Sequence, residues 1–98
     1  MNLSYRIENM MDAPAMLPVA QLDRFVTDLL VIVQRVTRGK TYGLVDRESC
    51  RRELGLNDAE FEVVIGHGRQ RGYIDTQAAY GRLSLTRRGI ERLAQIWR

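Results

Sequence analysis

The clearest pattern in the chain is an apolar stripe with helical spacing between Gln21 and Arg38. Its members recur three and four positions apart and share one helix face: Leu22, Phe25, Val26, Leu29, Ile32, Val33 and Val36. Gly39 follows and is expected to end the helix. Leu30 and Val31 fall outside the stripe, so we predict that they form a dimer contact or pack against the N-terminal segment.

Two shorter helices are predicted in the middle of the chain, joined by a tight turn. The first spans 47 to 54 and follows an extended connector at 41–45, with Asp46 placed to cap it. The turn contains Gly55, which permits a left-handed backbone, and Asn57, which can cap the second helix. That helix runs from 58 to about 71 and turns an apolar face inward, formed by Phe61, Val64, Ile65 and Gly68. No packing role is evident for Gly66.

The last third of the chain predicts a β-hairpin and a final helix. Residues 73–77 and 82–85 alternate as strands on either side of a turn that ends in glycine. Thr86 is placed to cap a helix with apolar residues at helical spacing: Ile90, Leu93, Ala94 and Trp97. Residues 1–20 hold two prolines and no sustained period, so we expect an arm or linker, disordered or with a short strand, before one domain over 21–98.

Three fragments resemble the winged helix-turn-helix superfamily. Residues 53–61 (ELGLNDAEF) are similar to its helix-turn-helix corner, and residues 71–74 (RGYI) to the exit from its third helix into the wing. Residues 83–90 (LSLTRRGI) resemble the segment after the wing in regulators of the multiple-antibiotic-resistance and phenolic-acid type. The resemblance covers about 22–98 without identifying a subfamily. It implies a mainly α fold with a small β-hairpin (α+β), in the order helix, helix, turn, helix, wing, helix.

The charge of the chain is unevenly distributed. The net charge is +3, yet residues 1–34 hold two basic and four acidic side chains, so the remainder carries +5. An excess of this sign is expected of a phosphate-binding surface. The alternative is that the abundance of arginine over lysine reflects genomic base composition and the arginines only solvate the surface.

The resemblance also implies a DNA-binding surface. In DNA-binding members the third helix lies in the major groove and the wing contacts the minor groove or the backbone. The positions that correspond here lie on the second helix, the third helix and the wing: Arg47, Arg51, Arg52, His67, Arg69, Gln70, Arg71, Tyr80 and Arg82. Asp58, Glu60 and Glu62 oppose this interpretation, because acids near the start of the third helix repel phosphates.

No catalytic, cofactor or metal site is predicted. Cys50 shares a helix face with Leu54, which favours a buried thiol over a redox switch. His67 has no second histidine or cysteine at metal-ligand spacing, and no nucleophile accompanies it. The single cysteine, and the lack of a signal peptide or a membrane-length apolar run, indicate a cytoplasmic protein that does not act at a membrane.

The sequence thus predicts a small transcriptional regulator that binds double-stranded DNA as a homodimer, with Leu30, Val31 and Trp97 at the dimer contact. The alternative is a winged-helix adaptor that binds another protein without specific DNA binding. Recognition of RNA is a third interpretation, weakened because no aromatic platform is evident on a sheet face. The DNA sequence recognised and any inducing ligand are left open.

Overall fold

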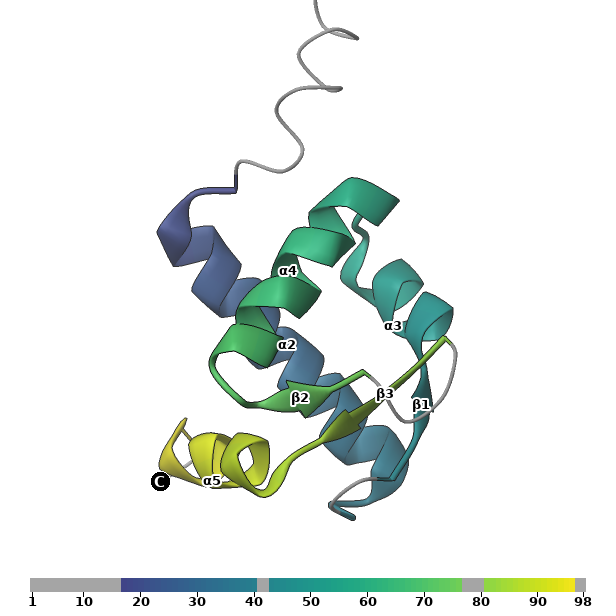
Figure 1. Ribbon diagram of the computed structural model, residues 1–98, viewed down its shortest axis with the longest axis vertical. Coiled ribbons are helices and arrows are strands. Elements are labelled where there is room, and N and C mark those ends of the chain that lie inside the picture. The colour runs from purple at the N-terminus through teal and green to yellow at the C-terminus, as the bar shows by residue number, and fades with distance from the viewer. Residues whose placement is uncertain (1–16, 41–42, 77–80, 97–98) are drawn as a thin grey trace, which may run out of the picture.

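The computed structural model describes residues 17–40, 43–76 and 81–96. This part of the chain is mainly helical and carries a small antiparallel sheet, which confirms the α+β class (Figure 1). The elements in chain order are α2 (Val19–Thr37), β1 (Val45–Asp46), α3 (Arg47–Leu54), α4 (Asp58–Gln70), β2 (Ile74–Asp75), β3 (Arg82–Leu85) and α5 (Arg87–Ile96). Most of the predicted N-terminal arm, together with Tyr80 and Trp97, lies outside the described residues.

Helix α2 is the element around which the others pack. It contacts α3, α4, α5 and strand β3, and it buries Val26, Leu29, Leu30, Ile32 and Val33. The prediction that Leu30 is a dimer contact is therefore wrong: the side chain is fully buried, because helices cover α2 over a wider arc than its stripe predicts. Val36, assigned to that stripe, is instead 52% exposed near the end of the helix.

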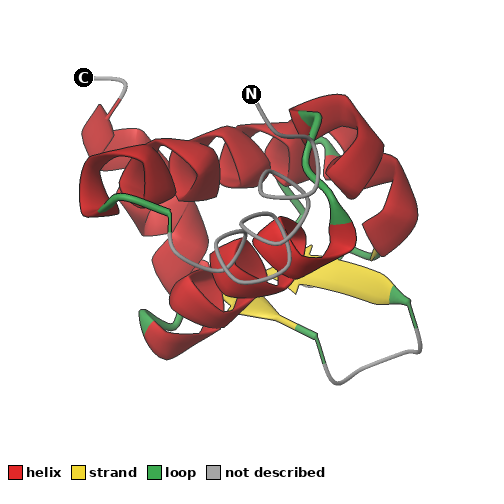
Figure 2. Cartoon of the chain, turned by 90° about the horizontal axis from the view of Figure 1, so that it is seen from above, coloured by secondary structure: helices red, strands yellow, loops and turns green. Residues whose placement is uncertain are grey.

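The sheet has three strands in the order β1-β3-β2. The predicted hairpin is confirmed by the antiparallel pairing of β2 with β3, in which Ile74 lies opposite Leu85. Strand β1 was predicted only as an extended connector, but Val45 pairs antiparallel with Leu83 of β3. All four of these side chains are buried, so the three strands contribute to the same core as the helices. Figure 2 shows the strands at one edge of the molecule beside the helices.

Local capping bonds set the boundaries of α3 and α4. The Asp46 carboxylate accepts from Ser49 N at 2.8 Å and begins α3, and Gly55 ends it with a φ of 72°. Asn57 and Glu60 then form a reciprocal capping box at the start of α4, with bonds of 2.8 and 2.9 Å. The predicted caps are confirmed, and with them the tight turn that joins these two helices.

Helix α5 is fastened to the segment that leaves α4. Thr86 Oγ1 accepts from Gly89 N at 3.1 Å, as predicted for a cap, and donates to the carbonyl of Gly72. Gly89 packs so closely on the Tyr73 carbonyl that a Cβ there would overlap the oxygen. Of the predicted apolar stripe, Leu93 is buried and Ile90 is partly buried, but Ala94 is exposed. Among the described helices, none is long and apolar enough to cross a membrane.

Two glycine substitutions test this packing. We expect Gly89→Ala to destabilise the fold by about 1–3 kcal/mol, because the new methyl group has no room beside Tyr73. Gly66→Ala is the matched control: a Cβ there meets nothing within 4 Å, so it should stabilise α4 by up to about 1 kcal/mol. Urea denaturation measures the change in the free energy of unfolding for both variants, provided that the m-value is unchanged. An unaltered midpoint for Gly89→Ala would contradict the close contact.

Candidate nucleic-acid interface

Helix α4 presents one long face to solvent. It buries Phe61, Val64, Ile65 and Gly68 and lies against α2. The exposed residues from its start to its last turn are Asp58, Ala59, Glu62, Gly66, Arg69 and Gln70. The predicted inward face is thus confirmed, and a partner can reach the helix along most of its length.

The acids in the first half of α4 are all engaged within the chain. Glu60 Oε1 accepts from the backbone N–H of Asn57 in the capping box. Asp58 Oδ1 lies 3.4 Å from Arg51 Nε, and Glu62 forms an ion pair with Arg47. Partners of opposite charge or polarity reduce the repulsion that these carboxylates exert on a phosphate. The main objection from the sequence to nucleic-acid binding is thereby weakened.

The same pairs occupy two arginines that the sequence predicted as phosphate clamps. Arg47 lies with its guanidinium carbon 5.3 Å from the centre of the Phe61 ring, a cation–π arrangement, while it pairs with Glu62. Arg51 donates to the Leu56 carbonyl at 2.7 Å and to both oxygens of Glu48. These bonds raise the pKa of Arg51 and lower that of Glu48. Both arginines hold α3 against α4 and are not free cations.

His67 and Arg71 are directed toward α2. His67 Nε2 lies 3.2 Å from Asp23 Oδ1, and only 18% of the histidine side chain is exposed. Arg71 Nη2 lies 4.0 Å from the same oxygen, although about half of its side chain is exposed. The predicted nucleic-acid contact by His67 does not fit this placement, because its ring is used to fasten α4 to α2.

Four of the predicted contact residues remain available. Arg69 and Gln70 are exposed on the last turn of α4, Arg52 is exposed on α3, and Arg82 is exposed at the start of β3. None of the three arginines has an ion-pair partner among the described residues. They are therefore the cations of α3, α4 and β3 that are best placed to meet an external anion.

The predicted dimer residue Val31 is partly buried against the core. It lines a hollow of about 300 Å³ between α2 and α3, together with Phe25, Ile32 and Leu54. The rim carries charged groups, among them Arg35, which donates to both oxygens of Glu53 at 2.8 Å. The residue thus lies beside an open surface, while Trp97 lies outside the described residues.

Cys50 is fully buried, in agreement with its predicted place in the core. Burial raises the pKa of its thiol to about 11, which disfavours the reactive thiolate. Within the described ranges, no group of three or more potential metal ligands is present. Comparison of the chain with family models, with curated proteins and with solved structures found no match.

Arg51 and Arg52 are neighbours with different surroundings, which makes them a matched pair. Arg51→Ala removes the bonds that join Glu48, Leu56 and Asp58, so we expect the melting temperature to fall by several degrees. Arg52→Ala removes an exposed side chain and should leave the melting temperature nearly unchanged. Circular dichroism melts at pH 7 measure both. Equal effects would contradict the assignment of Arg51 to the α3–α4 corner.

The Cys50 thiol predicts a pH dependence of stability. The folded pKa of about 11 lies above the reference value of 9.0, so the unfolded chain ionises first as the pH rises. The free energy of unfolding should therefore fall between pH 9 and 11, by about 2–3 kcal/mol from this group. Urea titrations across that range, with Cys50→Ala as the comparison, isolate the contribution. The variant should show a shallower fall, and identical slopes would contradict the prediction.

Proposed function

We propose that the chain is a winged-helix domain that binds duplex DNA, with α4 as the recognition helix. The order of elements supports the fold: α2, β1, α3, a tight turn, α4, then β2 and β3, in a sheet of order β1-β3-β2. In this interpretation α3 and α4 form the helix-turn-helix, and the hairpin of β2 and β3 is the wing.

One observation carries the DNA-binding proposal. Every acid of α3 and α4 has a partner within the chain, whereas Arg52, Arg69 and Arg82 are exposed without one among the described residues. The formal charges of α3, α4 and Arg82 balance, with five basic and five acidic side chains, but the acids are paired, so the charged groups left free to meet an anion are arginines. Arginine can bind the edge of guanine through two bonds, and glutamine, here Gln70, can bind adenine in the same way. Arg52 and Arg82 would then hold phosphates and set the position of α4.

A homodimer that functions as an intracellular transcriptional regulator belongs to the same proposal. Two copies related by a two-fold axis would present paired α4 helices to a palindromic site. The open hollow beside Val31, lined by both apolar and charged side chains of α2 and α3, is a surface that a second copy could cover.

A second function, the binding of a partner protein, is favoured by a different feature of α4. Two of its exposed positions, Ala59 and Gly66, are small and uncharged, with the partly exposed Val63 between them, and Gly66 has open space beside it. A partner helix can approach such a ridge closely. An adaptor of this kind would not require the free arginines.

Fluorescence anisotropy with a duplex of mixed sequence tests the DNA-binding proposal. At low salt we expect binding with a Kd of about 1–100 µM or tighter, since non-specific binding by basic domains falls in that range. Arg69→Ala and Arg82→Ala should each weaken it and reduce the slope of log K against log salt by about 0.9 for each phosphate that the variant no longer neutralises. Arg24→Ala is the control, because it removes the same charge from the exposed side of α2.

Absence of binding at low salt would reject DNA as the partner and leave the adaptor function. An equal effect of Arg24→Ala would show that net charge, and not the α4 surface, governs the interaction.

A further inference from the structure

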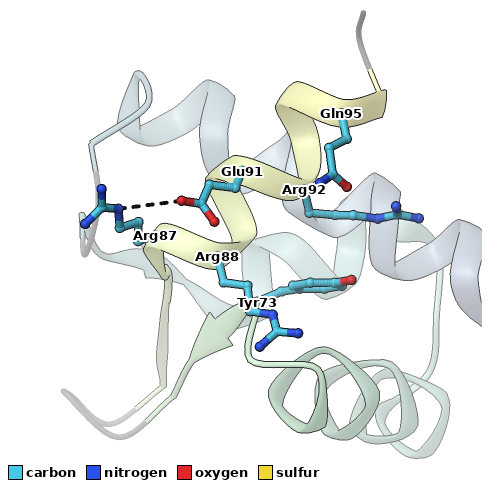
Figure 3. A pocket seen from close by; sticks show the side chains of 6 residues that line it. All are labelled: Tyr73, Arg87, Arg88, Glu91, Arg92 and Gln95. Atoms are coloured by element: carbon cyan, nitrogen blue, oxygen red, sulfur yellow. Dashed lines mark ion pairs between the residues drawn. The ribbon is translucent and has the colours of Figure 1, made fainter.

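A second cationic site lies away from the exposed face of α4. A hollow of about 530 Å³ is formed between α5 and the residue that precedes β2, and it is lined by Tyr73, Arg87, Arg88, Glu91, Arg92 and Gln95. Figure 3 shows Arg88 and Arg92 extending from α5 beside the ring of Tyr73. Helix α5 follows the end of β3 opposite to Arg82, the first residue of that strand (Figure 1). The hollow is therefore separate from the surface proposed to bind DNA.

The walls of this hollow are fixed by the fold. Thr86 N donates to the Tyr73 carbonyl at 3.0 Å, and Gly89 packs directly on that carbonyl. The Arg88 stem lies over Gly72, where a Cβ would be 3.4 Å from Arg88 Cδ. Tyr73 and the first turns of α5 are thus held in one arrangement before any ligand binds, which lowers the entropy lost on binding.

The charge in the hollow is not balanced. Arg87 Nε lies 3.6 Å from Glu91 Oε2, so this arginine is compensated. Arg88 and Arg92 stand four residues apart on one helix face, where like charges repel. Neither has an ion-pair partner among the described residues. A small adjoining hollow is also lined by Tyr73 and Arg92, and it contains one acid, Asp23. This carboxylate already pairs with His67 and Arg71.

We propose that this hollow binds a small organic phosphate of mononucleotide size. Arg88 and Arg92 both line the hollow, and guanidinium groups favour a phosphate, which can accept several bonds from each. The volume is within the usual range for small-molecule sites and exceeds what a phosphate alone requires. Tyr73 provides an aromatic surface on which the planar base can stack, and Gln95 provides an amide for its polar edge.

Calorimetric titration of the full chain with adenosine 5′-monophosphate at low ionic strength tests the site. We expect saturable binding, at least tenfold weaker for adenosine, which lacks the phosphate, and for inorganic phosphate, which lacks the base. The double variant Arg88→Ala/Arg92→Ala should lose at least tenfold in affinity. Tyr73→Leu should weaken binding and Tyr73→Phe should retain it, because only the leucine removes the ring. Arg24→Ala is the charge-matched control and should bind as the unaltered chain does.

Titration of the same variants with duplex DNA separates this site from the proposed DNA surface. The proposal is supported when Arg88→Ala/Arg92→Ala loses the nucleotide but retains the duplex, and when Arg69→Ala and Arg82→Ala still bind the nucleotide. It is overturned when millimolar nucleotide gives no saturable binding, or when the double variant binds nucleotide unchanged. Loss of duplex binding in the double variant, with no nucleotide binding by the unaltered chain, would also overturn it and assign these arginines to DNA phosphates.

Discussion

The corner between α3 and α4 depends on the guanidinium of Arg51. This group reaches the Leu56 carbonyl in the turn, both oxygens of Glu48 one turn earlier, and the carboxylate of Asp58 at the start of α4. A single cation thereby contacts the turn and one acid from each of the two helices. Arg47 contacts α4 further along, where it pairs with Glu62 over the Phe61 ring. The exposed face of α4 owes both its orientation and its reduced negative charge to these two arginines.

The sequence predicted best those features that are set within a few residues. Asp46, Asn57 and Thr86 were identified as caps because a cap is a bond between a side chain and a backbone N–H two or three positions away. Pairing across elements was missed. The Arg47–Glu62 pair joins residues 15 positions apart, and a two-residue strand such as β1 is too short to show a period. The sequence does carry a signal for this pair. Arg47 stands at the start of one predicted helix, Glu62 stands in the first half of the next, and a tight turn joins the two helices.

One further error comes from packing that no local pattern encodes. Leu30 lies outside the apolar stripe of α2, yet it is fully buried because α2 is covered from more than one side. The glycines of α4 illustrate the opposite case. A Cβ at Gly68 would lie only 3.1 Å from Ile74 Cδ1, whereas a Cβ at Gly66 would meet open space. The helical period had already separated the two, because it placed Gly68 on the inward face of α4 and left Gly66 without a packing role.

One short segment joins the last turn of α4 to the hollow beside α5. Arg69 stands on the last turn of α4, and Tyr73, four residues later, forms a wall of the hollow beside α5. Thr86 ties this segment to α5 through the Gly72 and Tyr73 carbonyls. A ligand between Tyr73 and α5 would therefore contact the anchor that holds the end of α4. Residues 69–73 therefore connect the last turn of α4 to the wall of the hollow beside α5.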